Sequence, residues 1–167
     1  EWGLTVRQLL ELAGAGDTLA VQVGGPSGTC VSEAQFDRRL CYSDLGTGGA
    51  ITIFGAHRDL LSIVHNHMEF FTNETCGVCV PCRAGTAQMH ALLCKITEGR
   101  ATRDDLALLE SLCEMVKDTS LCGLGQTAPN PVLSTLKYFR DEYLAHIQQH
   151  HCPAGVCRIH RPTEVHV

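Results

Sequence analysis

The second half of the chain repeats hydrophobic residues every three or four positions, which is the spacing of one face of a helix. One such segment runs from about residue 57 to Asn73, and a second from about Ala84 to Glu98. A third follows Thr102, a residue type that caps helices well. Asn130-Pro131 opens a fourth, because proline is favoured in the first turn of a helix. The pattern predicts a four-helix bundle over residues 56–149.

The first 55 residues show a different pattern. Thr5 precedes a short amphipathic segment, and Leu19–Val23 and Ala50–Phe54 are rich in β-forming residues. One helix and two strands are too few for a stable sheet. We therefore expect residues 1–55 to be an incomplete α+β unit, completed by residues upstream or by another chain. Residues 150–167 form a tail rich in Cys and His.

The composition narrows the function classes. The 167 residues are 44% hydrophobic and 19% charged, with a formal net charge of −5. An acidic chain of this kind does not look like a nucleic-acid-binding protein, which would present a basic face. No apolar run is as long as a membrane helix requires, and residues 1–5 show no secretory signal pattern. The sequence predicts a cytoplasmic protein that does not insert into a membrane.

Cysteine is the most informative residue type in this chain. Cys76, Cys79 and Cys82 form a tight triplet, and Cys152 and Cys157 form a pair near the C-terminus. Disulfides within the triplet would be strained, and without a secretory signal a metal is the better interpretation there. The other five cysteines are isolated in the sequence: Cys30, Cys41, Cys94, Cys113 and Cys122.

The triplet has the spacing CxxCxxC, which lets three thiolates converge on one inorganic core. A [4Fe–4S] cluster needs four thiolates, and the fourth usually comes from elsewhere in the chain. Cys122 is the best candidate, because two helices would return the chain to the triplet just before the loop expected at 117–130. Cys94 and Cys113 lie at apolar positions of helices and are expected in the core. Zinc bound by four thiolates is the alternative.

Two longer segments resemble a known family. Residues 70–86 read FFTNETCGVCVPCRAGT, and residues 120–131 read SLCGLGQTAPNP. Both resemble the flavin-bearing, NADH-oxidising subunits of respiratory complex I. The second segment is most similar to the diaphorase subunits of NAD(P)-linked hydrogenases and formate dehydrogenases. Residues 21–28, VQVGGPSG, resemble the ubiquitin-like SLBB domain that precedes the helical bundle in that family.

The resemblance implies a fold and a function. The fold would be α+β, with a partial ubiquitin-like β-grasp segment before the bundle. A [4Fe–4S] cluster on Cys76, Cys79, Cys82 and Cys122 would relay single electrons between FMN and further clusters. Partners would be the flavin domain, ferredoxin-like subunits and [2Fe–2S] subunits of a multisubunit oxidoreductase. FMN and NAD(P) would bind elsewhere in that complex, since this chain shows no dinucleotide fingerprint. Whether the chain is itself an enzyme stays open, and we assign no catalytic residue.

The C-terminal pair suggests a second metal. His146, Cys152 and Cys157 have credible zinc spacing, and His57 or Cys41 would provide a fourth ligand. A disulfide or free thiols are equally acceptable for this pair. The histidines of the helical segments are expected to be ordinary helix residues rather than ligands: His65, His67 and His90.

Two other function classes compete with electron transfer. A zinc-stabilised module that docks partner subunits would use the same cysteines without iron. An enzyme with a nucleophilic cysteine would use Cys30, which we place in a turn, but no histidine stands in a recognisable partner motif. Electron transfer is the leading hypothesis, and the docking module is its alternative.

Overall fold

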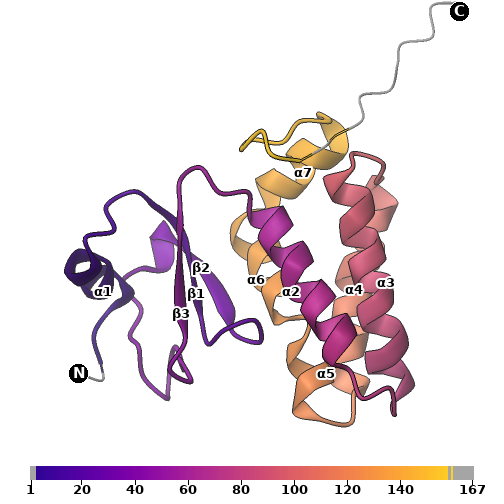
Figure 1. Cartoon of the computed structure of the whole chain (residues 1–167), viewed down its shortest axis with the longest axis horizontal. Helices are drawn as coiled ribbons and strands as arrows, with labels where there is room; N and C mark the ends of the chain where they lie inside the picture. The colour runs from indigo at the N-terminus through magenta and orange to yellow at the C-terminus, as the bar shows by residue number, and fades with distance from the viewer. Residues whose placement is uncertain (1–2, 158, 160–167) are drawn as a thin grey trace, which may run out of the picture.

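The computed structural model describes residues 3–157 and 159, so most of the tail beyond Cys157 lies outside the described residues. A small sheet with one helix lies beside a group of longer helices, as Figure 1 shows. In the sheet unit the elements are helix α1 (Val6–Ala13), strands β1 (Thr18–Val23), β2 (Thr29–Ser32) and β3 (Ile51–Gly55), and the short 3-10 helix η1 (Glu33–Gln35). The chain is therefore α+β.

The sheet has three antiparallel strands in the order β2-β1-β3. Val21 at the centre of β1 lies opposite Val31 of β2 and Ile53 of β3. The sequence pattern predicts only two strands and a turn at Cys30, and it misses β2. Cys30 is instead a buried residue of this strand. Four residues are too few to show a clear alternation, so only pairing with β1 identifies β2.

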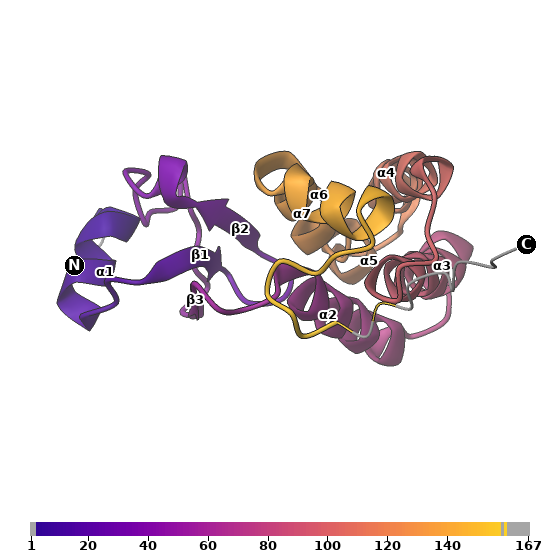
Figure 2. The same ribbon diagram turned by 90° about the horizontal axis from the view of Figure 1, so that it is seen from above.

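The sheet is covered on both faces, which explains how so small a sheet is held. Alternate residues of a strand point to opposite faces. Val21, Val23 and Val31 pack in one cluster with Val6 and Leu10 of α1. The opposite face packs against the helices through Ala20, Cys30 and Leu60. Figure 2 shows the sheet between α1 and the bundle.

The helical part differs from the expected four helices. Its elements are α2 (Leu60–Glu74), α3 (Val80–Thr97), α4 (Arg103–Thr119), α5 (Gly123–Thr127), α6 (Asn130–Tyr138) and α7 (Arg140–Gln148). The segment expected as a loop contains α5, and the expected fourth helix is divided at Phe139. Phe139 leaves the helical conformation, with φ −135° and ψ 35°, and its ring packs against the cluster that joins sheet and helices. Tertiary packing thus overrides the helical pattern here.

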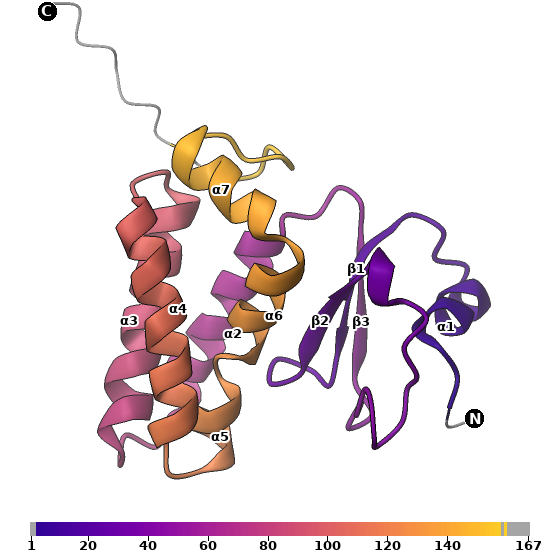
Figure 3. The same ribbon diagram turned by 180° about the vertical axis from the view of Figure 1, so that it is seen from behind.

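Helices α2, α3 and α4 run side by side and α6 and α7 close the core (Figure 3). Nineteen buried residues form one hydrophobic cluster, among them Met68, Met89, Leu109 and Tyr143. Cys113 belongs to this cluster, as the sequence predicted, whereas Cys94 is only half-buried and lies outside it. Among the described residues, no helix is long and apolar enough to cross a membrane.

Helices α3 and α4 approach closely at Gly85. A Cβ built on Gly85 would lie 2.1 Å from Cγ2 of Val116 on α4. We expect Gly85→Ala to lower the free energy of unfolding by about 1–2 kcal/mol, because overpacking a stiff neighbour outweighs the better helix propensity of alanine. The measurement is chemical denaturation of the purified chain.

The matched control for Gly85→Ala truncates the neighbouring side chain of Val116. In a Val116→Ala background the same Gly85→Ala change meets only the remaining Cβ, which lies 3.5 Å away. In that background the substitution should be neutral or slightly stabilising. Equal losses in both backgrounds would show that steric contact with Val116 is not the reason for glycine at this position.

Candidate metal centres

The triplet of cysteines lies where the chain passes from α2 into α3. Cys76 is exposed in the connection, Cys79 is the N-cap of α3, and Cys82 is buried in its first turn. Gly77 has φ +76°, a conformation that glycine adopts without strain, and it turns the chain between the first two cysteines. The connection is thus shaped so that one loop and one helix start present three sulfurs.

Cys122 lies in the segment that returns to this connection. It is exposed and is the N-cap of α5, after α4 has brought the chain back along α3. Hydrogen bonding to the backbone of its neighbour Leu121 is the main reason why the pKa of Cys79 is lowered. On the other side, a Cβ built on Gly125 would lie 3.0 Å from Cβ of Cys82. The segment that carries Cys122 therefore contacts both Cys79 and Cys82.

The surroundings of these sulfurs suit bound thiolates. Thr75 Oγ1 lies 3.2 Å from Cys82 Sγ, and the N-terminus of the long helix α3 places its positive dipole end beside the cysteines. Ser120 Oγ is buried without a hydrogen-bond partner within the described residues. A donor set of thiols alone selects an iron–sulfur cluster or zinc. The residues present fit such a group.

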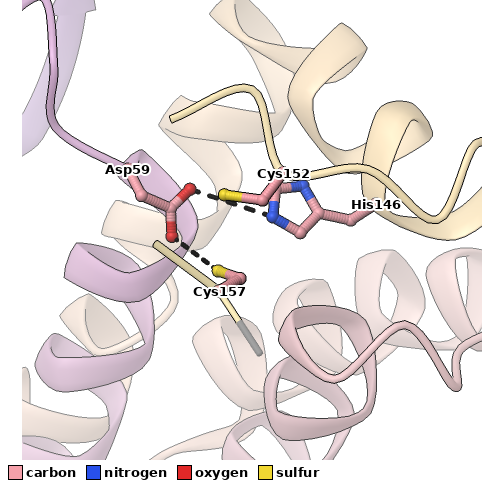
Figure 4. A group of neighbouring side chains, drawn as sticks. All are labelled: Asp59, His146, Cys152 and Cys157. Atoms are coloured by element: carbon pink, nitrogen blue, oxygen red, sulfur yellow. Dashed lines mark hydrogen bonds and ion pairs between the residues drawn. The ribbon is translucent and has the colours of Figure 1, made fainter. Parts of the chain in front are cut away.

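A second group gathers four side chains from distant parts of the chain. Figure 4 shows Asp59 at the start of α2, His146 on α7, and Cys152 and Cys157 in the segment after α7, all turned toward one another. One ligand atom from each lies within 4.8 Å of all the others. The Cys157 thiol donates to Asp59 Oδ2 at 3.0 Å, and His146 Nε2 lies 3.9 Å from Asp59 Oδ1.

The buried polar atoms of this second group lack partners. The side chains of Asp59 and His146 are fully buried, yet Asp59 Oδ1 and His146 Nε2 have no hydrogen-bond partner among the described residues. His146 Nδ1 lies 2.8 Å from the carbonyl oxygen of Glu142, which fixes the proton on Nδ1 and leaves Nε2 as a free lone pair. Leaving such atoms unpaired is costly, and a buried cation would satisfy them.

Burial and neighbouring charge also shift pKa values at the second group. Burial, followed by the neighbouring Asp59, raises the pKa of the Cys157 thiol. Burial and Asp59 also raise the pKa of Glu142 to about 7. Both shifts in pKa come first from burial and then from the neighbouring negative charge of Asp59. A divalent metal would reverse them, because it stabilises thiolate and carboxylate together.

The group contains neither of the two residues expected to provide a fourth ligand. His57 is exposed and lies outside it, and Cys41 belongs to the sheet unit, where its sulfur lies 3.4 Å from Ser43 Oγ. Asp59 takes their place. It is the N-cap of α2 and accepts a bond from the Ser62 N–H at 2.8 Å. In a sequence, the capping role is enough to explain an aspartate at the start of a helix, so the pattern gives no reason to consider Asp59 as a candidate ligand.

Known proteins resemble this chain over most of its length. The model of the NADH-ubiquinone oxidoreductase-F iron-sulfur binding region matches residues 62–146. The NAD-reducing hydrogenase HoxS subunit alpha of Cupriavidus necator is 47% identical over 154 residues, covering 92% of this chain and 26% of the relative. An NADH-quinone oxidoreductase relative from Mycobacterium tuberculosis is 35% identical, over 90% of this chain and 36% of the relative.

A solved structure shows the same arrangement. The crystal structure of an NAD⁺-reducing [NiFe]-hydrogenase in the H2-reduced state matches with a TM-score of 0.82 and 37% identity, over 92% of this chain and 28% of that one. The chain thus spans about a quarter to a third of the length of the relatives it matches.

Proposed function

Because this chain belongs to the family of the NADH-ubiquinone oxidoreductase-F iron–sulfur binding region, we propose that it is the electron-relay part of an NAD(P)H-linked oxidoreductase. It would pass single electrons between a flavin, held by another part of the protein or by another chain, and further clusters of a multisubunit complex. The observation that carries the proposal is the return of the Cys122 segment onto Cys79 and Cys82. The zinc-stabilised docking module is not favoured by the family match.

The ligands of the proposed [4Fe–4S] cluster are Cys76, Cys79, Cys82 and Cys122. When bound, the cluster supplies one-electron transfer without proton chemistry. The chain's own residues determine the charge and the water around the sulfurs. The Leu121 backbone and the start of α3 stabilise negative charge on the sulfurs, and the burial of Cys82 keeps water from one side of the site.

The electron partner would pack over the exposed side of the same site. Cys76 and Cys122 are exposed there, and large apolar side chains that stand in solvent lie next to the cluster cysteines in the sequence: Val78, Val80 and Leu121. Exposed apolar groups that gather at a redox site mark a surface covered in the assembled protein. We assign the flavin-bearing domain of the parent complex to this surface, because electron transfer needs a short path to the flavin.

The experiment that tests the relay is metal and sulfide analysis of the chain purified without oxygen. We expect about four iron and four sulfide per chain, with a broad visible absorbance that bleaches on reduction. Zinc with no iron would overturn the relay and leave the docking module. A variant of the half-exposed thiol Cys41, Cys41→Ser, should keep the full iron content.

We also propose that Asp59, His146, Cys152 and Cys157 bind one structural zinc ion. The support is the buried, unpartnered Asp59 Oδ1 and His146 Nε2 beside two thiols. One carboxylate, one imidazole and two thiolates complete a tetrahedral set with no open position. Such an ion would tie the segment after α7 to the start of α2, which adjoins the sheet unit.

A further inference from the structure

A third set of ligand side chains lies on α2 and α3, apart from both sites above. It consists of His65 on α2 and of His90 and Cys94 on α3. One ligand atom from each lies within 4.8 Å of the other two. His65 Nε2 is 3.1 Å from Cys94 Sγ, and the rings of His65 and His90 have centroids 4.4 Å apart.

The helices themselves produce this convergence. His90 and Cys94 are four residues apart, so they lie on the same face of α3, one turn above the other. The antiparallel packing of α2 on α3 then places His65 across from both. The sequence pattern predicts ordinary helix surface for these histidines and core for Cys94, since each is unremarkable alone. In the structure Cys94 is half-buried at the edge of this helix pair.

One of the donor atoms is buried without a hydrogen-bond partner among the residues described, which favours a metal. His90 Nε2 is buried with no hydrogen-bond partner within the described part of the chain. Burial and, after it, the nearby His65 lower the pKa of His90. The Glu69 carboxylate raises the pKa of His90. Burial and then Glu98 raise the pKa of the Cys94 thiol, and Arg100 lowers it. A plain His65–Cys94 hydrogen bond leaves His90 Nε2 without a partner.

We propose that His65, His90 and Cys94 form an exchangeable zinc site with one open coordination position. Two imidazoles and one thiolate are ligands that Zn²⁺ prefers, and three protein ligands leave the fourth position of a tetrahedron for water or an outside ligand. Binding transfers the Cys94 thiol proton to solvent and involves no change of oxidation state. The proposal does not depend on the iron–sulfur cluster.

Access distinguishes this site from the buried one. All three ligand residues are half-buried, and His65 lines an open groove of about 220 Å³. Cys157 of the second group reaches the same groove, but the Asp59 and His146 side chains of that group are fully buried. Zinc at this site should therefore exchange with a chelator, whereas zinc held by the buried Asp59 and His146 should not exchange readily.

The test uses the full chain carrying its iron. After dialysis against EDTA, the protein is titrated with Zn²⁺ by calorimetry, and total zinc is measured. We expect one ion to be taken up again, and Cys94→Ser or His90→Ala to weaken this uptake more than about a hundredfold, since loss of a residue that merely orients a ligand already costs about 10–100-fold. Cys41→Ser and His67→Ala are the matched controls and should bind as the parent chain does.

A second measurement does not rely on substitutions. Co²⁺ added to the EDTA-treated parent chain should give a sulfur-to-cobalt charge-transfer band, which Zn²⁺ then removes. The proposal is overturned if no ion beyond the retained zinc is taken up, or if uptake is the same in Cys94→Ser. Iron and sulfide content is measured in the same samples, so failure of this site and failure of the relay are separate results.

Discussion

Replacing Cys122 by serine removes most of the iron from the protein. The expected content falls from about four iron per chain to less than about one, and the signal of the reduced cluster in electron paramagnetic resonance disappears. The reason is that a [4Fe–4S] cluster needs four thiolate ligands, and the α2–α3 connection provides only three. Cys122 is the cysteine that the α3–α4 pair returns to them, next to Leu121, whose backbone hydrogen-bonds Cys79.

The controls for Cys122→Ser show whether the iron is lost because a cluster ligand is missing or because any thiol has been replaced. Cys41→Ser makes the same chemical change at a half-exposed thiol of the sheet unit and should leave the iron untouched. Because Cys122 is exposed, its serine variant should fold with the helical content of the parent chain, measured by circular dichroism. Unchanged iron in Cys122→Ser would refute the four-cysteine assignment.

Replacing His146 by alanine should cost the protein its buried zinc and at least about 3 kcal/mol of stability. The loss is large because the substitution breaks a buried charged set and leaves the Asp59 carboxylate without a counter-ion. For a chain of this size the unfolding midpoint should fall by about 6–12 °C in a thermal melt. His57→Ala is the control, since His57 is exposed only two residues from Asp59 and should retain both zinc and stability.

Asp59→Asn tests the same site with an effect that changes sign. Asparagine caps helices as well as aspartate does, so the bond to the Ser62 N–H is kept and only the charge is lost. The substitution should destabilise the zinc-loaded chain but stabilise the chain stripped of zinc, where the buried charge is uncompensated. Destabilisation of equal size in both states would contradict a metal-binding role for Asp59.

The family could be predicted from the sequence because its signal is local, and the relay stays a proposal. The Cys76–Cys82 spacing needs one loop and one helix start, and the sequence shows both. Cys122 as the fourth ligand stays a prediction, which rests on the two helices between it and the triplet and on their clear periodicity. The incomplete ubiquitin-like unit and the boundaries at 55/56 and 149/150 stay predictions, although β3 ends at Gly55 and α7 at Gln148.

The elements that the sequence missed depend on contacts between distant residues. Strand β2 is visible only through its pairing with β1, and the break at Phe139 only through the ring's packing against the sheet. The four residues of β2 carry too little periodicity, whereas at Phe139 packing overrides a continuous helical pattern. In both cases the burial of apolar surface against another element decides the conformation.

The sequence by itself determined the three long helices α2, α3 and α4, the helix cap at Thr102 and the cysteine triplet, because each follows from residues within a few positions of one another. Only the tertiary structure decided which side chains meet. It placed the capping Asp59 rather than His57 beside His146, and it brought His65 across to His90 and Cys94. The physical reason is that a metal site requires lone pairs to converge within a few ångströms. That convergence depends on how helices pack, which the spacing of residues along the chain does not specify.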